Sequence, residues 1–382
     1  MTSKILKVSV FLLIILTIVG GIYYLKLPNR HKAIIKTQVY HKLGLVDDTW
    51  NIKTSDSTIS LFTPTFVIDN IYKSMEGPKV MTSFQIDYTK DELVWITSFE
   101  TRAMSTNEVD QLSNDYVCHT NIDFYDGEHY SRWNLTNRIG EQYPRLTSMS
   151  NGIEAYKFPE GFGFPVFTNE NLFVVTQTLN HNIKGDAFTV KHDVVLGYKP
   201  NSPEMNPLMS RTVFVMLPYD NDQPFKGPTE NNPNMCLPVE TKNHSYVDEE
   251  GHHLSGHWVI YKGKETYRYD ITKQLQLKDS TTMHQIAVHL HPFAEELEFR
   301  DKTSDSTLFV SKAENYTDKI GLKNVSYFSS AEGIMLYPDH QYELVLKTNN
   351  TTTTNQDMMA SMFVFLYDKE MAEKLKGYNL KQ

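Results

Sequence analysis

The sequence predicts an all-β protein, with two tandem antiparallel jelly-roll β-sandwich domains behind an N-terminal transmembrane helix. Short runs rich in β-branched and aromatic residues recur between turn residues, and helix-length periodic windows are few. Aromatic residues make up 12% and hydrophobic residues 40% of the 382 residues, which is enough to build buried cores. A chain of this length is expected to form about two domains.

An apolar segment opens the chain. Residues 8–25 are apolar or small throughout and follow Lys4 and Lys7, and their length just spans a bilayer. Because no clear small-x-small cleavage site follows, we expect an uncleaved signal anchor over residues 1–30. Basic residues flank both ends, so charge alone does not fix the orientation. We expect a membrane-anchored protein whose soluble part is extracytoplasmic, in the periplasm or the extracellular space.

Residues 31–198 are predicted to form the first β-sandwich domain. Between residues 82 and 88, larger apolar side chains alternate with smaller or polar ones, as in a half-buried strand. A Gly- and Pro-rich break at 161–165 precedes a further strand, which is typical of a jelly roll. The predicted strands cover residues 80–88, 93–104, 116–125, 171–179 and 187–198.

A linker is predicted over residues 199–210, which hold three Pro and show no periodicity. Residues 211–382 are then expected to form the second β-sandwich domain. His-rich residues 251–258 are interpreted as a turn because glycines and polar residues flank the histidines, with another metal site as the alternative. After an apolar run at 211–217, the predicted strands of this domain cover residues 283–289, 296–300, 308–310, 342–347 and 358–367.

The most informative pattern is His289-Leu290-His291. Side chains at positions i and i+2 of a strand leave on the same face, so the two imidazoles can bind one ion. A thioether as third ligand favours a soft metal such as Cu(I), and Met358 in the last predicted strand can supply it. A β-bulge in that strand would make Met359 the donor instead.

His289-Leu290-His291 and residues 349–367 resemble the C-terminal domain of the copper type II, ascorbate-dependent monooxygenases. This family includes peptidylglycine α-hydroxylating monooxygenase and dopamine β-monooxygenase. The resemblance implies that His289, His291 and Met358 bind an oxygen-activating copper. It also implies hydroxylation of a small-molecule substrate at a C–H bond, with O2 and a reductant such as ascorbate.

The resemblance further implies a second, electron-supplying copper in the first domain, held in the family by three histidines. Cys118-His119 occupies the place of an adjacent histidine pair, and His181 lies near the third position. His119 and His181 are therefore predicted ligands of an N-terminal copper, with hydrogen-bonded sheet histidines as the alternative. Cys118 can itself ligate copper as a thiolate. In an exported chain it can instead pair with Cys236 in a disulfide, or both can remain thiols.

The substrate is expected to differ from a glycine-extended peptide. In the peptide-amidating enzyme, an Arg two residues before the first His and an Asn and a Tyr after the Met hold the peptide carboxylate. Here the corresponding residues are Ala287, Ala360 and Met362, and none of them binds a carboxylate. An apolar or aromatic substrate fits these positions better.

Two other functions remain open at this point. A non-catalytic, extracytoplasmic double jelly roll that binds copper or another ligand would explain the altered N-terminal copper motif. A cupin-type Fe(II) oxygenase would use His289, His291 and Glu295, but Met283 stands where the first cupin glycine belongs. The net charge of −9 argues against a nucleic-acid partner.

Overall fold

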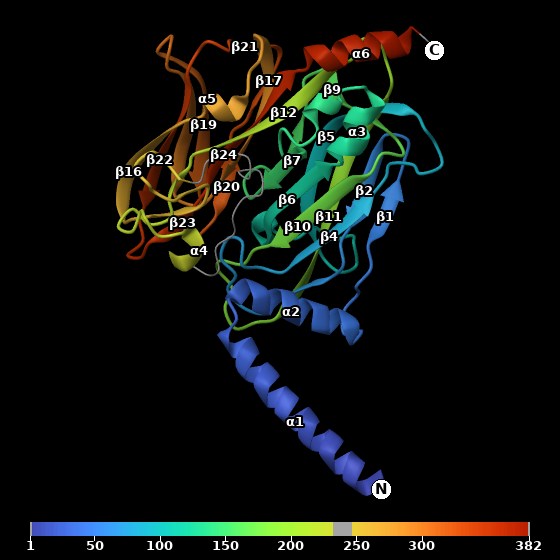
Figure 1. The fold of residues 1–382 in the computed structure, drawn as a ribbon, viewed down its shortest axis with the longest axis vertical. Coiled ribbons are helices and arrows are strands. Elements are labelled where there is room, and N and C mark those ends of the chain that lie inside the picture. The colour runs from blue at the N-terminus through green and yellow to red at the C-terminus, as the bar shows by residue number, and fades with distance from the viewer. Residues whose placement is uncertain (1, 232–246, 381–382) are drawn as a thin grey trace.

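A computed structural model of the chain describes residues 2–231 and 247–380. The fold is mostly β-structure, with several sheets that are largely antiparallel and an apolar helix at the N-terminus (Figure 1). This confirms the predicted all-β body behind an apolar helix.

The largest sheet runs through both halves of the protein and has 11 strands within the described residues. The two halves join where β9 pairs in parallel with β12, with Asn206 opposite Phe162. Of the predicted linker, only residues 201–205 lie outside strands. The order along the sheet is β1 (Asn51–Thr54), β2 (Thr58–Phe62), β11 (Phe188–Pro200), β5 (Leu93–Met104), β9 (Phe162–Phe167), β12 (Asn206–Phe214), β24 (Ala360–Tyr367), β17 (Thr281–Leu290) and β21 (Phe328–Leu336), while β3 (Phe66–Ile68) pairs with β11 and β8 (Ala155–Lys157) with β5.

Smaller sheets accompany each half. A 4-stranded sheet contains β4 (Lys79–Phe84), β10 (Leu172–Thr178), β6 (Val117–Phe124) and β7 (Arg145–Ser150), in that order. A 5-stranded sheet contains β16 (Gly263–Asp270), β22 (Tyr342–Asn350), β18 (Ala294–Asp301), β19 (Ser306–Asn315) and β20 (Leu322–Val325). Two short pairs complete the described strands: β13 (Leu217–Pro218) with β14 (Leu254–Ser255), and β15 (Trp258–Ile260) with β23 (Gln356–Met358).

The 4-stranded sheet packs its apolar face against the large sheet. Ile122 of β6 and Val174 of β10 are fully buried in one core with Ile96 and Val194 of the large sheet. Alternation along β6 turns its odd-numbered residues, His119 among them, to the opposite face. That polar face is directed toward the second half of the protein, so a site between the halves can use it.

Helices lie at the edges of this β-structure. α1 (Thr2–Lys26) projects away from the body, and α2 (Asn29–Lys42) lies across its base (Figure 1). α2 contacts the body through buried Ala33 and through His41, whose Nε2 donates to the carbonyl of Thr65 (2.9 Å). The other described helices are α3 (Asp126–Arg132), α4 (Pro228–Asn231), α5 (Thr272–Leu275) and α6 (Lys369–Asn379), with short 3-10 turns η1 (Asn114–Tyr116) and η2 (Thr136–Arg138).

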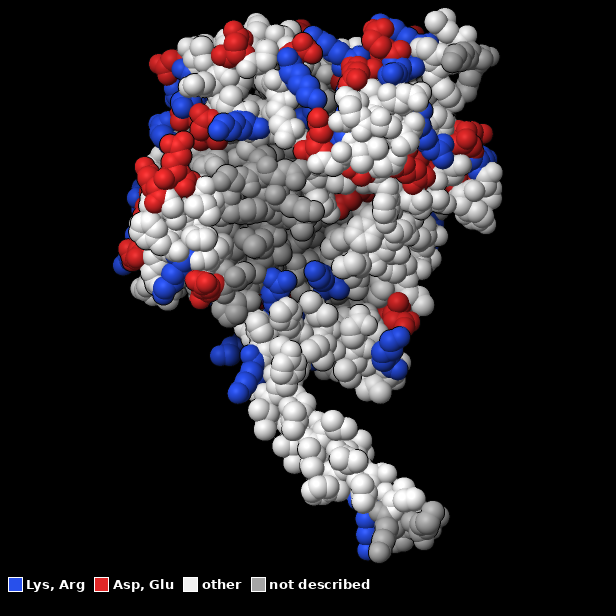
Figure 2. Space-filling view, viewed as in Figure 1, with Lys and Arg blue, Asp and Glu red and all other residues white. Residues whose placement is uncertain are grey.

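α1 has the length and apolar composition of a membrane span over residues 5–26. No charged residue lies between Lys7 and Lys26, and Figure 2 shows this surface almost free of charge. A signal sequence near the N-terminus has the same properties, so the length and composition of α1 fit either a membrane anchor or a signal sequence.

Most predicted strands are confirmed. The strand expected at 93–104 coincides with β5, and the strand expected at 358–367 is broken at Met359, where the chain passes from pairing with β15 in β23 to pairing with β12 and β17 in β24. β16 was not among the predicted strands, because its exposed polar residues alternate with partly buried ones and its apolar pattern is weak.

We predict that Gly77→Ala destabilises the protein. A Cβ at Gly77 would collide with the backbone carbonyl of Thr178, and that backbone is fixed in the sheet. Overpacking of this kind costs about 1–3 kcal/mol, so the denaturant midpoint should fall. Gly127→Ala in α3 is the control, since nothing lies within 4 Å of its added Cβ. Equal midpoints for the two variants would show that the Gly77 turn relaxes freely.

Candidate metal centre and adjoining cavity

His289 and His291 lie side by side between the two halves of the protein. His289 belongs to β17, opposite Ser361 of β24, and His291 follows one residue after the strand ends. Both side chains are buried, and their ring centroids are 5.3 Å apart. Two imidazoles that bind one tetrahedral ion at about 2 Å have centroids roughly 5 Å apart, so the spacing suits a shared ion.

A backbone hydrogen bond orients the ring of His291. Its Nδ1 donates to the carbonyl of Asp357 (3.3 Å), because a carbonyl only accepts. In the neutral ring this leaves Nε2 unprotonated, with its lone pair available for a metal. Nε2 of His291 and Nδ1 of His289 are buried without a hydrogen-bond partner in the described part of the chain. Metal-binding histidines commonly donate their other nitrogen to a carbonyl in this way, so the residues fit a metal ion.

The two adjacent methionines lie in different surroundings. Met358 ends β23 opposite Trp258, and it is fully buried in the main apolar core. Met359 lies in the break between β23 and β24 and lines the same cavity as His289. The thioether on the histidine face is therefore Met359, while the Met358 ligand expected from the sequence stays a prediction.

His119 and His181 lie near the C-terminal histidines. The ring of His119 on β6 is 6.5 Å from that of His289, centroid to centroid, and its Nδ1 is 3.4 Å from the sulfur of Cys118. His181 follows β10, and a positive charge on His181 would lower the pKa of His291. Residues predicted for two separate coppers thus meet in one region. The predicted partner of Cys118, Cys236, lies outside the described residues, so the disulfide is a prediction only.

His257 was not among the predicted copper ligands, although another metal site was the alternative for residues 251–258. The glycines and polar residues around it suggested a turn, but the apolar run that begins at Trp258 forms β15 and pairs with β23. His257 is buried, its ring centroid lies 5.7 Å from that of His291, and its Nε2 is 3.7 Å from a carboxylate oxygen of Asp357. The Trp258–Ile260 run was the available signal for a strand that carries His257 inward.

Burial keeps these imidazoles neutral. Desolvation lowers the pKa of His119 to about 3 and the pKa values of His181 and His289 to about 4. Desolvation, with smaller contributions from His289 and His257, holds the pKa of His291 well below its usual range. The neutral imidazole is the form that binds metals, so at neutral pH no proton has to leave before an ion binds.

A cavity of about 200 Å³ adjoins the histidines, between the outer face of the 4-stranded sheet and strands β17 and β24. From β17 and the segment that follows β23, it is lined by His289, Met359, Ser361 and Phe363. Alternation along β24 explains why the last three share one face. Ala360 and Met362, which the sequence suggested as substrate contacts, lie fully buried in the apolar core instead.

The first half contributes a polar wall to the cavity. The guanidinium of Arg145 forms a buried ion pair with Asp123, whose other oxygen accepts a hydrogen bond from the hydroxyl of Tyr143 (2.9 Å). The two charges compensate each other, as buried charges must. The ion pair therefore holds Arg145 and Asp123 in place and leaves these two side chains without net charge.

Two further buried histidines, His284 and His192, have structural roles. His284 is buried, and its Nδ1 donates to the carbonyl of Ser330 (3.0 Å). His192 of β11 is fully buried between two sheets. Its Nε2 donates to the carbonyl of Tyr116 (3.3 Å), and its Nδ1 accepts from the hydroxyl of Thr176 (2.7 Å).

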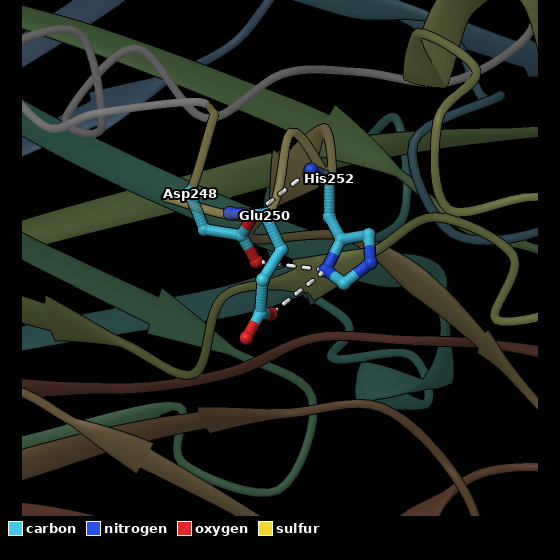
Figure 3. A group of neighbouring side chains, drawn as sticks. All are labelled: Asp248, Glu250 and His252. Atoms are coloured by element: carbon cyan, nitrogen blue, oxygen red, sulfur yellow. Dashed lines mark hydrogen bonds and ion pairs between the residues drawn. The ribbon is translucent and has the colours of Figure 1, made fainter.

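The predicted turn around His252 is confirmed. His252 Nδ1 lies 2.9 Å from a carboxylate oxygen of Asp248 and 3.5 Å from one of Glu250 (Figure 3). The amide of Gly251 donates to the carbonyl of Asp248, which closes the turn. These side chains satisfy one another at the surface, and exposed acidic groups of this kind are common without an ion.

Glu295, the carboxylate that a cupin site would require, lies at the surface, unlike the two histidines. Glu295 is 42% exposed and accepts a hydrogen bond from the amide of Asn349 (3.0 Å). His289 and His291 are buried. The structure thus adds no support for the iron alternative.

The comparisons with known proteins give weak likenesses. No protein-family model and no curated protein matches the sequence. PNGase F, a glycosylasparaginase from Flavobacterium meningosepticum, is 11% identical with a TM-score of 0.33, covering 82% of this chain and 96% of its own. The major capsid protein P2 of bacteriophage PM2 is 7% identical with a TM-score of 0.28, covering 79% and 97%. Such scores assign no activity to this chain.

We predict that His192 makes the protein sensitive to acid. Desolvation lowers its pKa from 6.5 to about 4, so between these pH values the unfolded chain takes up a proton that the folded one excludes. The free energy of unfolding should then fall by about 1.4 kcal/mol per pH unit on acidification through this window. Urea unfolding of wild type and His192→Gln from pH 7 to pH 4 measures this slope. The slope for His192→Gln should be smaller than that of wild type by the contribution of about one proton. Identical slopes would contradict the lowered pKa of His192.

Proposed function

We propose that this chain is a copper-dependent monooxygenase that hydroxylates a C–H bond of a small, mainly apolar or aromatic substrate, with O2 and a reductant such as ascorbate. The proposal includes two tandem jelly-roll domains, with the soluble part held outside the cytoplasm by α1. The observation that carries it is the hydrogen bond from His291 to the carbonyl of Asp357, which presents an unprotonated nitrogen beside His289. Two imidazoles and a thioether favour Cu(I).

Bound copper would supply the one-electron chemistry that activates O2. The protein's part is to hold the ion, bind the substrate and exclude water. His289 and His291 are fixed by β17 and by the Asp357 carbonyl. Phe214 and Phe363 give the adjoining cavity apolar surfaces against which a substrate can pack.

The position of Met359 supports it as the sulfur donor. It shares a cavity with His289, whereas Met358 packs in the core. With Met359 as donor, the residues two and four positions later become Ser361 and Phe363, and both line the cavity. A hydroxyl and an aromatic ring then take the substrate-facing places, consistent with an aromatic or apolar substrate.

His119 and His181 are the proposed ligands of a second copper. The 6.5 Å between the rings of His119 and His289 supports a second ion close to the first rather than one in a distant part of the first half. Cys118 stands where the family has another histidine. The second site therefore offers two histidine donors, one fewer than the three of the family.

The altered second site supports one alternative, a non-catalytic protein that binds copper or another ligand outside the cytoplasm. The two functions differ in a measurable way. About two coppers per chain and ascorbate-dependent O2 consumption support the monooxygenase. One copper and no O2 consumption with any tested substrate support the binding protein.

We predict that His289→Ala and His291→Ala each weaken Cu(I) binding by at least about 100-fold, since loss of a second-shell partner alone costs 10–100-fold. Competition with a chromophoric Cu(I) chelator measures the affinity. The same variants should abolish ascorbate-dependent O2 consumption. His340→Ala is the control, because its imidazole pairs with Asp301 in a loop. Wild-type affinity in both histidine variants would refute the copper site.

We predict that Met359→Leu removes the copper–sulfur scattering from the X-ray absorption spectrum of the Cu(I) protein. Met358→Leu is a matched control at the adjacent position, and both changes nearly conserve volume. Met358→Leu should keep the sulfur signal and lower stability slightly, because it alters the core. The opposite pattern would restore Met358 as the ligand.

A further inference from the structure

The cavity beside His289 is suited to an apolar molecular body. Phe214, Phe363, Val175 and Met81 supply apolar surface to a space of about 200 Å³. A cavity of about 150 Å³ holds a benzene molecule. The available space therefore fits one aromatic ring with a short side chain.

One cation in the cavity lining lacks a carboxylate. Arg145 is paired with Asp123. Lys79, at the start of β4, also lines the cavity, and it makes no ion pair or side-chain hydrogen bond with any residue in the described part of the chain. Among the described residues, the cavity lining thus carries one uncompensated positive charge.

Strand register places this charge in line with the histidines. Lys79 lies opposite Gln177, and Gln177 lies opposite His119, so the three form one row across β4, β10 and β6. Adjacent strands are about 4.8 Å apart, which puts the backbones of Lys79 and His119 about 10 Å apart. His289 lies beyond His119 in the same cavity. A molecule of one ring and a short chain can span this row.

Exposure gives the row a direction. Met81, two residues after Lys79 on the same face of β4, is 48% exposed, whereas His119 and His289 are buried. Lys79 therefore lies toward the mouth of the cavity and the histidines lie at its inner end. A bound molecule held at Lys79 would present its far end to the histidines.

We propose that the cavity binds a small molecule with an apolar or aromatic body and one anionic group, and that Lys79 holds the anionic group. The inference rests on the proposed function only in identifying this molecule as the substrate. It narrows the substrate class from apolar or aromatic molecules to those that carry a carboxylate or a similar anion.

The test uses the full chain in nanodiscs of neutral lipid, without copper, and three probes of matched shape: 3-phenylpropionate, 3-phenylpropanamide and 3-phenylpropan-1-amine. Calorimetry or ligand-observed NMR gives the dissociation constants. A hydrogen bond to a charged group contributes about 1.5–3 kcal/mol, so the carboxylate should bind at least about tenfold more tightly than the amide.

Variants at Lys79 make the test specific. Lys79→Gln should reduce carboxylate affinity to that of the amide, and Lys79→Glu should reverse the preference toward the amine. Lys73→Gln, at an exposed lysine outside the cavity lining, should change nothing. Equal binding of carboxylate and amide, a preference that survives Lys79→Gln, or no binding of any probe would overturn the proposal.

The test of the anionic ligand and the test of copper binding can fail separately. A carboxylate preference that depends on Lys79, together with histidine variants that bind copper as well as wild type, would refute the proposed monooxygenase and keep the anionic ligand. Copper binding that depends on His289 and His291, without a carboxylate preference, would refute the anionic ligand and keep the monooxygenase.

Discussion

The two-residue period of the β-strand is the constraint on which the site depends. On β6, Ile122 turns into the core between the sheets of the first half while His119 turns outward. On β17, Leu290 turns into the core of the second half while His289 turns to the cavity. Because alternate residues of a strand leave on opposite faces, the face of β6 that carries His119 and the face of β17 that carries His289 meet where the halves adjoin.

The same arrangement explains why the imidazoles are neutral and available. Buried polar atoms are normally hydrogen-bonded, and a buried nitrogen without a partner is costly. His192 and His284 satisfy the rule with neighbouring carbonyl and hydroxyl groups. His289 and His291 each retain one buried nitrogen without a partner in the described chain, and a metal ion would offset that cost. This contrast separates the candidate ligands from the structural histidines.

The features that the sequence predicted depend on the alternation of residues along a single strand. Few features that depend on contacts between distant strands were predicted. The strand at 93–104 and the facing of His289 follow from alternation alone. The choice between Met358 and Met359 could not be settled from sequence, because a shift of one residue exchanges the faces of a strand. The cavity was also inaccessible to sequence reasoning, since it joins β4 to β24 across the whole chain.

The shift from Met358 to Met359 changes how the substrate contacts should be considered. With Met358 as donor, the residues two and four positions later are Ala360 and Met362, which are buried in the core and do not face the cavity. With Met359 as donor, Ser361 and Phe363 face the substrate, and neither carries a positive charge. A charged anchor for an anionic group then has to come from the other half of the protein. Lys79 lies on that opposite wall, so metal ligands and substrate anchor would be divided between the two halves, and the cavity would work only when both are in place.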